Sequence, residues 1–185
     1  MAKINVTTTS ANMTLNGNTV NVYGAGTVNT INVNNANGKL IVYDGGTVNN
    51  ATVSQDEGKI SAYSGGVLNN TNIAADQTYV SVYNGGKANK TTITNNGSMF
   101  VRDGGTASET TITSGDMKVY TGGVADVVTL NRFGYTEVYG GTVNNAVINS
   151  AGHLNVFDGK INNAAIKSGG DLKLADGVGH IVRDS

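Results

Sequence analysis

The sequence predicts an all-β fold, a single-stranded parallel β-helix (β-solenoid) of about nine turns. Three observations support this fold class: apolar residues occur in short pairs at a spacing of two, tyrosines recur every 18–20 residues, and a glycine pair follows most of them. A period near 20 residues is too short for helical-hairpin repeats, which need about 34. Two short strands and two corners fill such a period and make one turn of a solenoid.

The stretch Leu40–Val53 shows the repeat most clearly. Leu40 and Val42 predict one strand, Ala51 and Val53 predict a second, and a glycine pair separates them. Copies of this unit occur at Ile60–Ile73, Val80–Ile93, Met99–Ile112, Met117–Leu130, Thr136–Ile148 and Leu154–Ile166, with less regular copies at Val20–Val33 and from Leu172 onward.

The glycine pairs predict one sharp corner in each turn. Glycine suits such a corner because the bend needs a positive φ or a close approach of stacked backbones. The glycines of this glycine corner are Gly45 and Gly46, Gly65 and Gly66, Gly85 and Gly86, Gly104 and Gly105, Gly122 and Gly123, and Gly140 and Gly141. The opposite corner varies in length between copies, so we expect it to be the more exposed one.

Equivalent residues of successive turns should stack about 4.8 Å apart, which turns the sequence repeat into columns along the rod. Three apolar columns are expected to point inward and form a thin core. They are Leu40, Ile60, Val80, Met99, Met117, Leu154 and Leu172; Val42, Ala62, Val82, Val101, Val119, Val138 and Val156; and Val53, Ile73, Ile93, Ile112, Leu130, Ile148 and Ile166.

Residues 1–19 are interpreted as an atypical first coil or N-terminal cap, and residues 20–185 as one continuous solenoid array. The N-terminus lacks the charged and apolar regions of a signal peptide, which indicates a fragment of a longer protein or an intracellular chain. In the final turn, the stretch His180–Val182 is followed directly by Arg183 and Asp184, without an evident cap.

The composition excludes several classes of protein. The formal net charge is −1, which argues against binding to nucleic acid or to anionic lipid. The chain has no cysteine, so disulfides and thiolate metal sites are excluded, and it has no proline, which suits uninterrupted strand ladders. No apolar run approaches the length of about 18 residues that a membrane span needs.

Two outward columns are the candidates for function. The residue before the glycine corner is Tyr23, Tyr43, Tyr63, Tyr83, Arg102, Tyr120, Tyr139 or Phe157, and this tyrosine column either binds glycans or another rod, or packs on itself. Arg102 is expected to stack on its two tyrosine neighbours.

An asparagine column follows the corner and predicts a structural ladder of amide hydrogen bonds, with a sugar-binding track as the alternative. Its members are Asn29, Asn49, Asn69, Asn89, Asn144 and Asn162.

No constellation of residues predicts catalysis, and no cofactor or metal is expected. Asp44, Asp103 and Asp158 occupy equivalent positions, but they are too far apart to act as a pair of catalytic acids. His153 and His180 lie more than one turn apart without a third ligand, which argues against a metal site or a catalytic triad. The chain is therefore predicted not to be an enzyme.

The repeated pattern Val-Tyr-x-Gly-Gly, best preserved in the segments Val42–Val53, Ala62–Ile73 and Val82–Ile93, resembles the repeats of AIDA-like autotransporter adhesin passenger domains. The likeness covers roughly Val20 to Ile166. The resemblance implies a right-handed parallel β-helix displayed on the bacterial surface or secreted, with roles in adhesion, self-association and biofilm formation. It also implies glycosylation of Ser or Thr in some members.

The sequence therefore leads to two hypotheses of function. The first is a non-catalytic structural rod, a fragment of a bacterial surface adhesin that mediates adhesion or self-association, side by side or end to end. Its partners would be another copy of the rod, or a glycan or protein on a host or bacterial surface. The second is a carbohydrate-binding β-helix module that uses the stacked tyrosine column.

Overall fold

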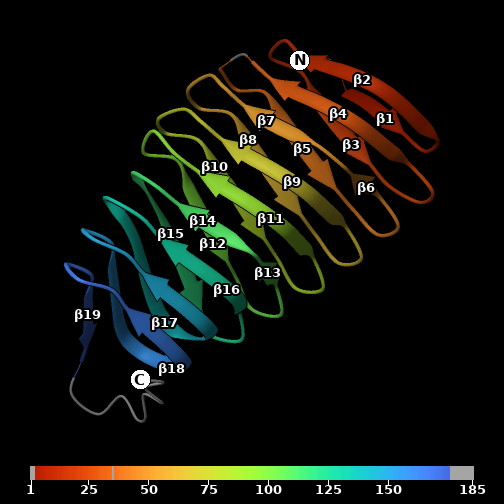
Figure 1. The fold of residues 1–185 in the computed structure, drawn as a ribbon. Coiled ribbons are helices and arrows are strands. Elements are labelled where there is room, and N and C mark those ends of the chain that lie inside the picture. The colour runs from red at the N-terminus through yellow and green to blue at the C-terminus, as the bar shows by residue number, and fades with distance from the viewer. Residues whose placement is uncertain (1–2, 35, 176–185) are drawn as a thin grey trace.

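The computed structural model describes residues 3–34 and 36–175, and this part of the chain contains strands and no helix. Figure 1 shows the coils stacked along one axis, from β1 and β2 at one end of the rod to β19 at the other. All strand pairs are parallel. The predicted fold class, an all-β parallel solenoid of about nine turns, is thus confirmed. The predicted final turn from His180 onward lies outside the described residues.

One side of the rod, which we call the tyrosine face, is a stack of strands, most of which lead into the tyrosine column. Strand β5, for example, pairs with β3 below it and β8 above it, so that Leu40 lies between Val20 and Ile60. The strands of this face are β1 (Lys3–Val6), β3 (Thr19–Val22), β5 (Lys39–Val42), β8 (Lys59–Ala62), β10 (Tyr79–Val82), β12 (Ser98–Val101), β15 (Gly115–Tyr120), the first parts of β17 (Gly134–Ile148) and β18 (His153–Ile166), and β19 (Asp171–Leu174).

The other side, the asparagine face, carries the strands that follow the glycine corner, and it is the face toward the viewer in Figure 1. Its strands are β2 (Thr9–Leu15), β4 (Thr27–Val33), β6 (Thr47–Val48), β7 (Ala51–Val53), β9 (Val67–Ile73), β11 (Lys87–Ile93), β13 (Thr106–Ser108), β14 (Thr110–Ile112), β16 (Val124–Leu130) and the last parts of β17 and β18. In β17 and β18 one strand runs through the corner, which joins the two faces without a break.

Residues 3–15 form strands β1 and β2, which pair in register with β3 and β4. Val6 and Leu15 of this segment are buried against the next coil. The N-terminal segment therefore continues both strand stacks, and its exposed Ile4 lies at the end of the rod.

The core is a narrow space between the two faces. The three predicted inward columns are buried, except at the C-terminal end: Ile166 is 42% exposed, because no strand among the described residues stacks beyond it. Thr136 takes the place of an apolar residue in the column of Leu40 and is fully buried. Two further inward columns were not predicted, and both lie on the asparagine face. They are Val28, Val48, Leu68, Ala88, Ala107, Ala125, Val143 and Ile161, and Ile31, Ala51, Thr71, Thr91, Thr110, Val128, Ala146 and Ala164.

Candidate binding surface

The tyrosine column lies on the outer surface of the tyrosine face, directly before the glycine corner. The backbone places it there: the amide of Tyr43 donates to the carbonyl of Val22, and the amide of Tyr63 donates to that of Val42, one coil away. Because the preceding valines point inward, strand alternation turns the aromatic side chains outward. Most members are half-buried, and Tyr43, 39% exposed, is the most open of the tyrosines.

The rings of the central tyrosines stack along the rod. The ring centroids of Tyr63 and Tyr83 are 4.5 Å apart with an interplanar angle of 3°, and those of Tyr43 and Tyr63 are 5.4 Å apart at 14°. Near-parallel rings at this spacing cover each other's faces. The column therefore presents ring edges and hydroxyl groups to solvent, and its stacked faces are not free to act as platforms for a ligand.

Arg102 continues the column where it lacks a tyrosine. The guanidinium carbon lies 5.5 Å from the ring centroid of Tyr83 and 5.4 Å from that of Tyr120, and it is also 5.5 Å from Phe100 in the same coil. Beyond it, Tyr120 stacks on Tyr139 at 6.0 Å. The guanidinium of Arg102 thus lies between the rings of Tyr83 and Tyr120, and stacked rings continue the column on both sides of it.

The asparagine column forms a ladder of side-chain amides along the asparagine face. Asn49 donates to Asn29 at 3.0 Å, Asn69 to Asn49 at 3.3 Å, and Asn89 to Asn69 at 2.9 Å. Farther along, Asn162 donates to Asn144, which in turn donates to the carboxylate of Asp126. These bonds join amides of successive coils, so this column stabilises the stacking of the coils.

A second asparagine column lies beside the first and was not predicted. Asn70 donates to Asn50 at 3.4 Å, and Asn163 donates to Asn145 at 3.0 Å. The sequence signal was the Asn-Asn pair that recurs at the same place in four repeats. Two successive outward residues require a break in strand alternation, which the positive φ of Asn70 provides.

The glycines of the glycine corner have two different surroundings. The first of each pair adopts a positive φ, as at Gly65 and Gly85 (72° and 73°). The second packs against the backbone of the coil below: a Cβ on Gly66 would overlap the carbonyl oxygen of Val42, and one on Gly86 would overlap that of Ala62. Gly46, Gly105 and Gly123 are packed in the same way, and Gly45, Gly104, Gly122 and Gly140 have the positive φ.

The ion pairs of the tyrosine face lie toward its C-terminal end. Lys118 Nζ lies 2.9 Å from Glu137 Oε2, and this hydrogen bond raises the pKa of Lys118. Burial, reinforced by Glu137, raises the pKa of Tyr135 and of Tyr139. At the last described coil, the contact with His153 lowers the pKa of Asp171.

In the N-terminal half of the tyrosine face, a groove runs beside the tyrosine column. It has a volume of about 250 Å³ and is open to solvent. One wall carries Tyr63 and Tyr83, and the other carries side chains from the first residues of three successive strands, β5, β8 and β10. These are Lys39, Lys59 and Tyr79, and Ile41 and Ser61, which are neighbours in register, lie between the two walls.

The acidic residues that the structure describes do not converge on a site. Asp44 and Asp103 lie exposed at the glycine corner, as does Asp158. Within residues 3–34 and 36–175, no group of three or more His, Asp or Glu side chains is placed to hold a metal ion. His180, the second predicted histidine, lies outside these residues. In the same part of the chain, no helix is long and apolar enough to cross a membrane.

These features define a β-solenoid repeat protein with ladders of stacked side chains on both faces. Among solved structures, the chain is similar to the crystal structure of a hyper-glycosylated TibA fragment whose glycosylation was catalysed by TibC. The match covers 97% of this chain and 93% of the fragment, with a TM-score of 0.55 and 20% sequence identity. At this identity, the likeness shows a shared fold. No family model and no curated protein matches the chain.

Proposed function

We propose that the chain is a non-catalytic rod, part of a bacterial surface adhesin, which mediates adhesion or self-association. The observation that carries this proposal is the in-register repetition of surface columns over about nine turns. A weak contact made by one coil is repeated by the next, so that contacts add along the rod. The fold shared with the TibA fragment and the AIDA-like repeat pattern support a place on the bacterial surface or among secreted proteins.

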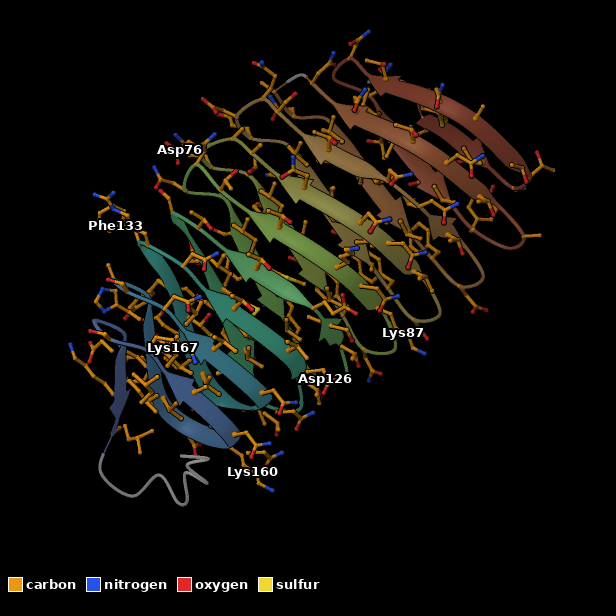
Figure 2. The ribbon with its side chains drawn as sticks, in the orientation of Figure 1. Asp76, Lys87, Asp126, Phe133, Lys160 and Lys167 are labelled. Carbon is orange, nitrogen blue, oxygen red and sulfur yellow. The ribbon has the colours of Figure 1, made fainter. Side chains whose placement is uncertain are left out.

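Side-by-side association would use the asparagine face. We call the corner opposite the glycine corner the far corner. The outermost column of the asparagine face toward the far corner, from Asn32 to Ala165, contains no charged residue. Of the charged residues labelled in Figure 2, Lys87, Asp126 and Lys160 lie near the glycine corner, and Asp76 lies at the opposite corner. A second rod can therefore approach this column without bringing like charges together.

Sedimentation of the rod over a range of concentrations tests this proposal, together with aggregation of cells that display it. Replacing Thr92 and Thr111 by lysine places two like charges in adjacent coils of the column, and we expect it to abolish association. The matched control replaces Gln55 and Gln77, two exposed corner residues, by lysine and should leave association intact. A rod that stays monomeric at high concentration and leaves cells dispersed would contradict self-association.

Carbohydrate binding through the tyrosine face is the second candidate, and the tyrosine column is its proposed contact surface. The stacked rings favour contact through their hydroxyl groups and edges, because their faces are covered. A glycan array tests this function. Signal that disappears when Tyr63 and Tyr83 are both replaced by phenylalanine would support it, because phenylalanine keeps the stack and removes the hydroxyl groups. Signal unchanged by these substitutions would contradict it.

Glycosylation of this chain on Ser or Thr is a further part of the proposal, supported by the hyper-glycosylation of the TibA fragment. Exposed hydroxyls at the glycine corner, such as those of Ser64 and Thr121, would be the acceptors. Thr91, 1% exposed, would not be modified. Peptide mass mapping of the protein from its native host tests the assignment, and modification confined to other positions would contradict it.

A further inference from the structure

The groove beside the tyrosine column has a different chemistry from the rest of the surface. It spans three successive coils, which corresponds to roughly 10 Å along the rod at about 4.8 Å per coil. Phe100 stands in the next coil, in register with Ser81, and its ring contacts that of Tyr79 at 5.8 Å between centroids. The bulky ring closes the groove at that end, so the site is a local feature and not part of the general repeat.

Positive charge is concentrated on one wall. Lys39 and Lys59 are direct neighbours in the register of β5 and β8. Among the described residues neither forms an ion pair, although Lys59 Nζ lies 5.3 Å from the ring centroid of Tyr79. Asp56 and Glu57 are in the adjoining corner, but both are exposed and unpaired with these lysines. Two adjacent ammonium groups repel each other, and an anion bound between them relieves this repulsion.

Hydroxyl groups and the apolar side chain of Ile41 line the rest of the groove. Tyr63 and Tyr83 present theirs from the opposite wall, and Ser61 contributes one from the floor. In the next coil, the hydroxyl of Ser81 is buried without a partner, although Ser81 lies on the outward side of its strand beside Tyr79. Ser81 is 1% exposed, so its hydroxyl lies beneath the surface of the groove. A ligand with many hydroxyl groups of its own would satisfy these donors and acceptors.

The hydrogen bonding of the backbone under the groove favours a saccharide over an acidic peptide as the ligand. The groove crosses β5, β8 and β10, each of which is already paired with a strand on both sides. An extended peptide lying in the groove would find no backbone donors or acceptors and could not add to the sheet. A saccharide needs only side-chain hydrogen bonds, and these are what the groove supplies.

We infer that this groove binds a short acidic saccharide segment that carries carboxylates, of the uronic-acid type. Lys39 and Lys59 hold the carboxylates, and the hydroxyls of Tyr63, Tyr83 and Ser61 bind the sugar hydroxyls. The inference rests on the carbohydrate-binding candidate and narrows it to one ligand class and one site. It does not depend on self-association of the rod.

Isothermal titration of the full chain with trigalacturonic acid tests the inference, with neutral galactotriose and triglutamate as comparison ligands. We expect binding of the acidic sugar alone, weakened by added salt. The double variant Lys39→Gln and Lys59→Gln should lose at least about tenfold in affinity, because two charge-assisted contacts are removed. The matched control Lys87→Gln and Lys160→Gln removes two lysines from the asparagine face and should bind as the unchanged protein does.

The outcomes separate this inference from the broader proposals. Equal binding of triglutamate, or binding unaffected by the loss of Lys39 and Lys59, would overturn the assignment. If neutral glycans bind in a manner that depends on the hydroxyls of Tyr63 and Tyr83 while the acidic sugar does not bind, the inference fails and the carbohydrate-binding candidate stands. If no glycan binds, both fail. Sedimentation of the Lys39→Gln and Lys59→Gln variant reports on self-association separately, and we expect it to be unchanged.

Discussion

The two corners of each coil reverse the chain in the same way, but their sequences differ. At the glycine corner a residue with positive φ is followed by a glycine packed on the coil below, as in Gly85 and Gly86. At the far corner the same two steps occur, as in Glu57 (φ 64°) and Gly58. The residue with positive φ is thus glycine in one corner and, in most coils, a residue with a side chain in the other.

The space outside each corner explains this difference. At the glycine corner the residue with positive φ backs onto the coil below, so that a Cβ on Gly104 would lie 2.6 Å from Asn84 Oδ1. Exposure does not separate the two corners, because Gly85 is exposed as Glu57 is, and Phe133 at the far corner is 59% exposed. A left-handed conformation alone costs a side-chain-bearing residue roughly 1–2 kcal/mol, which a stack of coils tolerates. Close packing against backbone is the stricter requirement.

The largest effect is therefore expected from the second glycine of the glycine corner. Gly86→Ala forces a Cβ onto the carbonyl oxygen of Ala62, which belongs to the strand ladder and cannot rotate away. We expect a loss of about 3 kcal/mol. Gly85→Ala keeps a positive φ and meets Ser64 Oγ at 2.9 Å, a side chain that can move, and should cost about 1.5 kcal/mol. Urea unfolding followed by circular dichroism measures both, and equal losses would contradict the distinction.

A smaller effect is expected where the obstacle is a side chain. A Cβ on Gly97, at the far corner, would overlap Ile73 Cγ2. Because this methyl group can shift, Gly97→Ala should cost about 2 kcal/mol, less than Gly86→Ala. A double-mutant cycle identifies the cause: in an Ile73→Ala background the cost of Gly97→Ala should nearly vanish. An undiminished cost in that background would show that Ile73 is not the obstacle.

A stabilising change is expected at the exposed left-handed positions. Glu57→Gly removes the side chain from a residue with φ of 64° and so removes the strain of the left-handed conformation. This gain should exceed the cost of the higher conformational entropy of the unfolded chain, and we expect a net stabilisation of about 0.5 kcal/mol. The control Gln55→Gly alters an exposed residue of the same corner that lacks a positive φ, and it should destabilise by about 0.5 kcal/mol. Thermal melts compare the two variants. A loss of stability in both would contradict this account of the far corner.

The corners also show how much of the fold the sequence could predict. The period of Tyr43, Tyr63 and Tyr83 with their glycine pairs was enough for the solenoid and for three of the core columns. The column of Val48 was missed because strand alternation breaks between Asn49 and Ala51, where two successive residues point outward. A rule of strict alternation places such a residue on the wrong side.

The surface was less predictable than the core. Strand alternation predicts an outward tyrosine column, but it does not give the orientation of the rings, and the near-parallel stack of Tyr63 and Tyr83 depends on packing between coils. The groove arises from side chains in three coils and from the absence of a bulky residue at Ser61. Its position depends on the heights of neighbouring side chains, which repeat spacing does not encode.

The smallest effect concerns the tyrosine column, which lies on the tyrosine face directly before the glycine corner. Burial, with the neighbouring Tyr83, raises the pKa of Tyr63 above its usual value of 10.0. A raised pKa in the folded state contributes stability that is complete below the unfolded value and is lost as the pH rises through the folded one. The melting temperature should therefore fall more steeply above about pH 10 in the unchanged protein than in Tyr63→Phe, which keeps the ring stack and has no ionisable hydroxyl at this position. The matched control Tyr23→Phe, whose ring makes no stacking contact among the described residues, should leave the alkaline slope unchanged. Identical alkaline slopes for Tyr63→Phe and the unchanged protein would show that the stack does not hold Tyr63 in its neutral form.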